Sequence, residues 1–163
     1  MLACVSWLPE SGSGRDDFER SFGLRPELFA AWREFAELFW EKRLVDPELL
    51  ELCRLRIAQL HRAEHPLSLR RPEARAAGLD ETKLARLAEW WKQPGFSELE
   101  RACLRFAEQF VVDAKGMSDE EAAPVIAALG EAGSVAFIEA LAIFDGISRF
   151  CRMLGVEPAP EDA

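Results

Sequence analysis

Apolar residues recur at helical spacing along almost the whole chain, and no segment alternates apolar and polar residues with the period of two that marks a strand. Amphipathic helices bury one such apolar stripe each. The pattern therefore predicts an all-α protein. It is clearest in the aromatic series Leu28, Phe29, Trp32, Phe35, Ala36, Phe39 and Trp40 and in the apolar segment 133–154.

Prolines, capping residues and glycines divide this pattern into about seven helices. Pro26 and the Asp46-Pro47 pair fit helix starts, and Ser97-x-x-Glu100 and Ser118-x-x-Glu121 fit capping boxes. The expected helices are 26–40, 47–63, 66–78, 80–91, 97–111, a short one after Ser118, and 133–154.

The chain of 163 residues fits a single domain. Residues 1–22 are predicted to form an N-terminal arm, residues 23–156 the domain, and residues 157–163 a disordered acidic tail. Phe18 and Phe22 make the arm too apolar for a free tail, so we expect it to pack on its own subunit or on a neighbour.

Charge and apolar patterning exclude several classes of function. A net charge of −9 argues against nucleic-acid binding, which needs a basic surface. We find no apolar run that approaches the roughly 20 residues of a membrane span and no basic leader, so no membrane association is predicted. The four cysteines lack CxxC or metal-type spacing, which favours a cytoplasmic location with reduced thiols and predicts no metal or other cofactor.

The segment from Pro47 to Arg70, PELLELCRLRIAQLHRAEHPLSLR, resembles the active-site segment of the carboxymuconolactone decarboxylase/alkylhydroperoxidase D (AhpD)-like family. Weaker similarities extend over residues 22–29, 76–80, 97–108 and 148–156, so the resemblance covers roughly residues 20–156. It implies an AhpD-like helical bundle that associates into dimers, trimers or hexamers.

In that family the helix runs into Cys-x-x-Cys-x-x-x-His, with a Glu twelve residues before the first Cys. Here the Glu is Glu51, but Ala63 and Pro66 stand at the cysteine positions and Arg70 stands at the histidine position. His65 lies at the second x, where some members also carry His. The family's cysteines reduce a hydroperoxide with help from the His and Glu, and a thiolate cannot form at Ala63 or Pro66.

The resemblance and these replacements lead to one main hypothesis and two alternatives. The main hypothesis is a non-redox protein that keeps the pocket and binds a small ligand or serves as an interaction module. The first alternative is an enzyme with a repurposed pocket, in which Glu51, His61 and His65 act as acid–base or metal-binding groups and Arg70 holds an anionic substrate. The second is a residual peroxidase that uses another thiol, such as Cys53, Cys103 or Cys151.

The residues of the repurposed pocket also have simpler interpretations. His61, Glu64 and His65 spell H-x-x-E-H, a zinc-peptidase pattern, but Pro66 disfavours one continuous helix through both histidines. Glu51 lies in the first turns of a helix and could pair with Arg54 or Arg56. The candidate catalytic residues are therefore Glu51 and His65, and the candidate pocket residues are His61, Ala63, Pro66 and Arg70.

Overall fold

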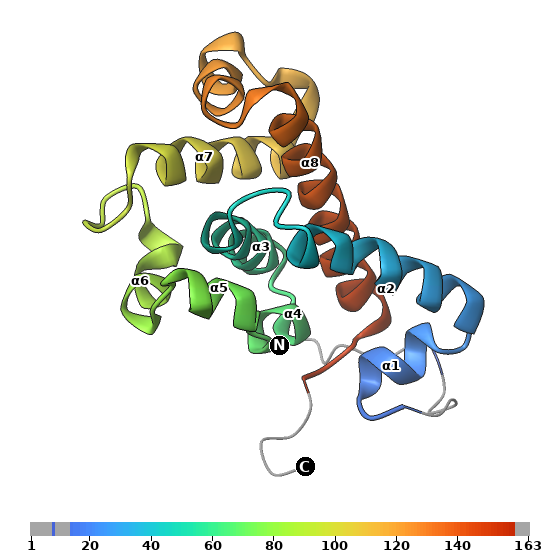
Figure 1. Cartoon of the computed structure of the whole chain (residues 1–163). Helices are drawn as coiled ribbons and strands as arrows, with labels where there is room; N and C mark the ends of the chain where they lie inside the picture. The colour runs from blue at the N-terminus through green and yellow to red at the C-terminus, as the bar shows by residue number, and fades with distance from the viewer. Residues whose placement is uncertain (1–7, 9–13, 159–163) are drawn as a thin grey trace.

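The computed structural model of the protein describes residue 8 and residues 14–158. Over these residues the chain forms eight α-helices and two short 3-10 helices, without a β-strand (Figure 1). This confirms the all-α prediction.

Helix α3 (Pro47–His61) is the centre of the bundle and packs against α7 (Glu98–Asp113), α8 (Asp119–Leu154) and α5 (Pro72–Ala77) (Figure 1). Its start matches the sequence prediction, because the Asp46 side chain accepts hydrogen bonds from the backbone N–H groups of Glu48 and Leu49 at 3.0 and 3.1 Å. Its end is set by Arg62, which adopts the left-handed conformation with φ 53° and ψ 44°.

Residues 64–78 do not form the single helix that the sequence analysis predicted from Pro66 to Gly78. They form two short helices, α4 (Glu64–Ser68) and α5, separated by an extended turn. Pro72 explains the difference: it cannot donate a backbone hydrogen bond and it pushes Arg71 into the extended region, with φ −82° and ψ 122°.

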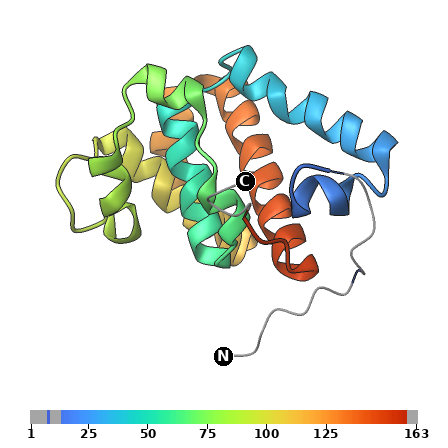
Figure 2. The ribbon, with the colours of Figure 1, turned by 90° about the horizontal axis from the view of Figure 1, so that it is seen from below.

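Helix α2 (Pro26–Glu41) lies across the C-terminal half of α8, and α1 (Asp17–Phe22) packs beside both of them (Figures 1 and 2). Residues 17–22 are thus helical within the segment predicted as an arm, with Asp16 as the N-cap of α1. Aromatic rings hold α1 in place: Phe18 and Phe22 each contact Trp32 of α2 and Phe150 of α8. The predicted disordered residues 159–163 lie outside the described part.

Helix α6 (Glu81–Arg86) and the 3-10 helix η1 (Leu87–Glu89) follow α5 along the chain. Both predicted capping boxes are present, at the starts of α7 and α8. A second 3-10 helix, η2 (Ala114–Gly116), joins these two helices. The two helices predicted after Ser118 run together as α8, with a non-helical residue at Gly130 (φ 69°, ψ 176°) between them.

Helix α8 is long and apolar enough, by these two criteria alone, to span a membrane. Its best 18-residue window has a mean hydropathy of 1.7, and 22% of that window is buried in the structure. The prediction of no membrane span rested on the absence of an apolar run of roughly 20 residues, and charged residues such as Glu139 and Asp145 interrupt the apolar part of α8. Core helices of proteins without membrane segments meet the same criteria, and Phe137, Leu141 and Phe144 of α8 are core residues.

Candidate functional site

Glu51 forms the most buried ion pair near the former thiol position. Its side chain is 1% exposed, and its two carboxylate oxygens accept hydrogen bonds from Arg54 Nε and Nη2 at 2.6 and 2.7 Å. The backbone N–H of Arg71 donates to the same carboxylate at 3.2 Å. Glu51 therefore forms the ion pair with Arg54 that the sequence offered as an alternative to a catalytic role.

Arg54 extends this interaction into the turn that follows α3. It donates from Nη1 to the carbonyl oxygen of Pro66 at 2.7 Å and from Nη2 to that of Leu69 at 2.9 Å. These bonds satisfy carbonyl groups that the short helix α4 leaves unpaired. The Glu51–Arg54 pair thereby fixes α4 onto α3.

Ala63 and Pro66, which we predicted to stand at the family's cysteine positions, are both buried, at the N-cap and within α4. The cysteines in the described part of the chain lie elsewhere and are free: Cys53, Cys103 and Cys151. Burial raises the pKa of the Cys53 thiol well above its ordinary value and raises the pKa of Cys103 and Cys151 to about 12 each. These three thiols stay protonated at neutral pH, so they lack the thiolate that peroxide reduction needs.

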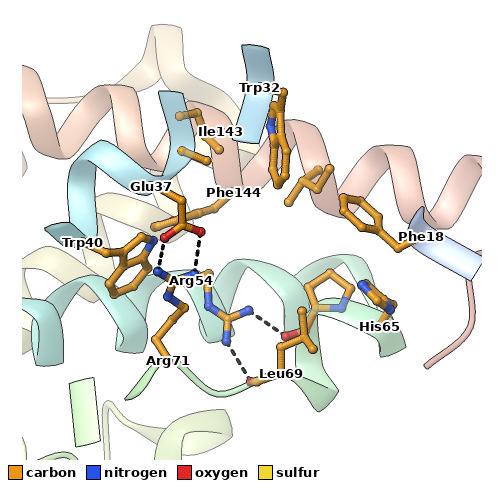
Figure 3. Close-up of a pocket in the computed structure, with 13 residues that line it drawn as sticks. Phe18, Trp32, Glu37, Trp40, Arg54, His65, Leu69, Arg71, Ile143 and Phe144 are labelled. Atoms are coloured by element: carbon orange, nitrogen blue, oxygen red, sulfur yellow. Dashed lines mark hydrogen bonds and ion pairs between the residues drawn. The ribbon is translucent and has the colours of Figure 1, made fainter. Parts of the chain in front are cut away.

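A cavity of about 120 Å³ lies beside Pro66, between α2, α4 and α8 (Figure 3). Most of its wall is apolar or aromatic, and Phe18 of α1 lines one side. The lining residues are Phe18, Trp32, Ala36, Glu37, Trp40, Arg54, His65, Pro66, Leu69, Arg71, Ile143, Phe144 and Ile147.

The charged groups of the cavity wall are paired with one another. The Arg71 guanidinium donates to both carboxylate oxygens of Glu37, at 2.9 and 2.6 Å, and lies 4.7 Å from the centre of the Trp40 ring (Figure 3). The hydrogen bonds from Arg71 lower the pKa of Glu37, which favours its ionised form. With Arg54 held by Glu51, each arginine of the wall has a carboxylate partner.

His65 also lines the cavity. It is 4% exposed, its ring stacks on Phe18 with centroids 5.0 Å apart, and its Nδ1 is buried without a hydrogen-bond partner (Figure 3). Burial lowers the pKa of His65. Asp16 and a backbone hydrogen bond with Glu157 raise this pKa, whereas Arg54 lowers it further. Burial is the largest of these effects, so the neutral ring is favoured.

The structure does not assemble the other predicted site residues around the cavity. His61 Nε2 lies 2.6 Å from Asp145 Oδ1 of α8, and Arg70 donates to the carbonyl oxygens of Leu67 and Leu69 at 2.6 and 2.8 Å. His61 ends α3 whereas His65 lies in α4, so the H-x-x-E-H pattern is not on one helix. Among the residues that the structure describes, no three His, Cys, Asp or Glu side chains are grouped to hold a metal ion.

Of the predicted set, His65 and Pro66 line the cavity, whereas Glu51 is connected to it through its hydrogen bonds with Arg54 and Arg71. The helical pattern assigned Trp32 and Trp40 to the core or a subunit interface, and no sequence pattern identified Glu37. The apolar character of the arm pointed to a packing role for Phe18, although not to this cavity.

Comparisons with known proteins agree with this architecture. The sequence model of the carboxymuconolactone decarboxylase family matches residues 26–109. A search of curated protein sequences found no match. A crystal structure of a protein of unknown function from Agrobacterium tumefaciens, provisionally named as the antioxidant defence protein AhpD, superposes with a TM-score of 0.76 and 20% sequence identity over 86% of this chain and 97% of that one.

The structural neighbour shows that the fold is AhpD-like, and at this level of identity it shows the fold alone. The family match includes α2, α3, α4 and most of α7, and therefore the segment that contains Ala63 and Pro66. The chain belongs to the carboxymuconolactone decarboxylase family.

Proposed function

We propose that the protein is a non-redox member of its family that binds a small molecule in the cavity beside α4. One observation carries this proposal: the positions that would hold the reactive thiols are Ala63 and Pro66, while a cavity remains next to them. A cavity lined mainly by apolar and aromatic side chains, with few polar groups, is the common form of a small-molecule site.

The contacts of the candidate catalytic groups favour binding over the repurposed-enzyme alternative. Glu51 uses both carboxylate oxygens in its bonds to Arg54 and the Arg71 backbone, and His61 is paired with Asp145. A general base must lie within hydrogen-bond reach of the proton that it removes, and neither Glu51 nor His61 lines the cavity. Of the predicted catalytic residues, His65 alone lines the cavity.

A peroxide-consumption assay with a dithiol reductant tests the non-redox part of the proposal. We expect the wild-type protein to consume hydrogen peroxide and an organic hydroperoxide no faster than the reductant alone, because the described thiols are buried and protonated. The non-redox part of the proposal would be overturned if the wild type consumed peroxide and the replacement of one cysteine by Ala, Cys4 included, abolished this activity.

A pair of alanine substitutions on α2 tests the binding part. Ala36 lines the cavity, whereas Ala31 is exposed on the same helix. A fragment screen by saturation-transfer NMR should give binders to the wild type and to Ala31→Leu that are lost in Ala36→Leu, whose larger side chain fills the cavity. Binders that survive Ala36→Leu bind elsewhere and contradict the proposal.

A further inference from the structure

We propose that helix α1 is a lid over the cavity, which swings away as a unit to admit the ligand and then brings Phe18 back against His65. The lid rests on the binding function proposed above, because it describes how a ligand reaches that site. Three observations support it: the small size of the cavity, the firm contacts of its other walls and the looser contacts of α1.

The cavity is too small to admit a ring-sized ligand while all its walls stay in place. Its volume is about 120 Å³, whereas an apolar protein cavity that holds one benzene molecule has a volume of about 150 Å³. His65 and Pro66 of its wall are buried. A ligand of this size therefore enters only if one of the walls moves.

Three of the walls are held by strong contacts. Arg54 donates to the carbonyl oxygen of Pro66 at 2.7 Å and so holds α4. The two hydrogen bonds from Arg71 to Glu37 hold α2 to the turn before α5. Phe144 of α8 is 5% exposed and belongs to the hydrophobic core. Moving any of these walls would break hydrogen bonds of charged groups or expose core side chains to water.

Aromatic contacts join α1 to these walls, and none of the six residues of α1 is buried. The Phe18 ring stacks on that of His65, with centroids 5.0 Å apart, and meets the Trp32 ring edge-on at 5.6 Å (Figure 3). Phe22 contacts Trp32 and Phe150 at 5.4 and 4.9 Å. Each ring contact is weak by itself, so the set can break and form again without the loss of a buried charge pair.

Local polar contacts stabilise α1 and move with it. They are the pairs of Arg15 with Glu19 and of Arg20 with Asp17, and the hydrogen bond from the backbone N–H of Glu19 to the Asp16 carboxylate. All of these contacts lie within one short segment of the chain, so α1 can leave the cavity without breaking them. The three residues 23–25 join α1 to α2 and form the hinge.

Modification of histidine by diethyl pyrocarbonate tests the lid on the wild-type protein without a ligand. The chain has two histidines, and peptide mass spectrometry distinguishes His65 from His61. Because Phe18 covers the ring of His65, the labelling of His65 should be slower than in the urea-unfolded chain. We expect the same factor to slow hydrogen exchange of the α1 amides, and a much larger factor to slow exchange of the α3 amides, because α3 opens only with the whole protein.

Two matched substitutions connect the labelling of His65 to α1. Phe22→Ala removes ring contacts of α1 with α2 and α8 but leaves Phe18 as the residue of α1 that lines the cavity. Fewer contacts then hold the lid closed, so the labelling rate of His65 should rise about tenfold. Phe110→Ala is the control, because Phe110 is also partly buried but lies on α7. It should leave the rate unchanged.

Three results would overturn the lid. These are labelling of His65 with the protection of the α3 amides, labelling as fast as in the unfolded chain, and equal rates in Phe22→Ala and Phe110→Ala. If Phe22→Ala does not fold, the comparison of His65 with the α1 and α3 amides in the wild type still decides.

The labelling and the fragment screen proposed above separate the lid from the binding function. If fragments bind in the cavity but the labelling of His65 does not follow the opening of α1, the binding function stands and the lid is wrong. If the labelling follows α1 but no fragment binds, α1 opens as proposed and the binding function fails.

Discussion

The Glu51–Arg54 pair makes a strong prediction about stability. Replacing Glu51 by Gln removes the negative charge and leaves Arg54, whose side chain is 10% exposed, without its counterion. Breaking a buried pair in this way costs about 3–5 kcal/mol. We expect Glu51→Gln to lower the free energy of unfolding, measured by urea denaturation, by an amount in this range.

Glu89→Gln is the matched control, because Glu89 forms an ion pair with Lys92 at 2.6 Å on the surface. Exposed pairs contribute at most about 1 kcal/mol. A loss for Glu51→Gln as small as that for Glu89→Gln would show that the buried pair does not fix α4 onto α3.

His65 predicts a pH dependence of stability. Burial lowers the pKa of His65 in the folded protein below the ordinary value of 6.5. Arg54 lowers this pKa as well, whereas Asp16 and Glu157 raise it by less than burial lowers it. The unfolded chain therefore binds the proton more readily, and stability is lost as the pH falls below about 6.5. His65→Leu should reduce the drop in melting temperature between pH 7.5 and pH 5.5. The same drop in both proteins would contradict this prediction.

The residue-level predictions from the sequence were best where chemistry is local. The pairing of Glu51 with Arg54 follows from neighbours along the chain. The Arg71–Glu37 pair joins residues 34 positions apart, and no sequence pattern predicts which distant charges meet. Helical periodicity assigned Trp32 and Trp40 to an inward face but could not show that packing leaves a cavity there.

At the scale of single elements, α8 contains a matched pair of glycines. Gly130 has a φ of 69° and a ψ of 176°, a conformation that residues with a Cβ adopt only at a cost of about 1–3 kcal/mol. A Cβ at Gly146, within the helix, would meet nothing within 4 Å. We expect Gly130→Ala to destabilise the protein and Gly146→Ala to stabilise it by about 0.5–1 kcal/mol.

Thermal unfolding followed by circular dichroism measures both effects on one helix. Equal changes in melting temperature for the two variants would show that Gly130 does not hold a special backbone conformation. A stabilising Gly130→Ala would mean that the two parts of α8 form one straight helix.

The sequence predicted the elements well where side chains cap helices locally, as at Asp46, Ser97 and Ser118. It failed where two signals compete. Residues 66–78 carry a helical pattern, but Pro72 interrupts it. Helix α1 has only six residues and is held by aromatic contacts with distant segments, so its own sequence gives no strong helical signal.

At the scale of the whole molecule, we propose that the protein self-associates through α2 and α8. An open apolar groove of about 410 Å³ runs along these helices, and Phe35 at its edge is 45% exposed. On the same helices Leu28, Val135 and Ile138 are also exposed. Exposed apolar surface of this extent is typical of a protein contact site.

Light scattering coupled to size-exclusion chromatography tests this proposal. The wild type should elute as an oligomer, and Phe35→Glu should shift it towards the monomer, because a buried contact would then contain an unpaired charge. Val112→Glu on α7 is the control, since Val112 is 75% exposed and lies on another helix. A monomeric wild type, or equal shifts in both variants, would contradict the proposal.

The walls of the cavity also bear on what a match to the family model implies. The family match spans residues 26–109, yet one wall of the cavity lies outside it: Phe18, Ile143, Phe144 and Ile147. Two relatives with equally good matches can therefore differ in the side chains that shape the binding space. The match to the family model therefore describes the central helices, whereas segments on either side of it complete the cavity.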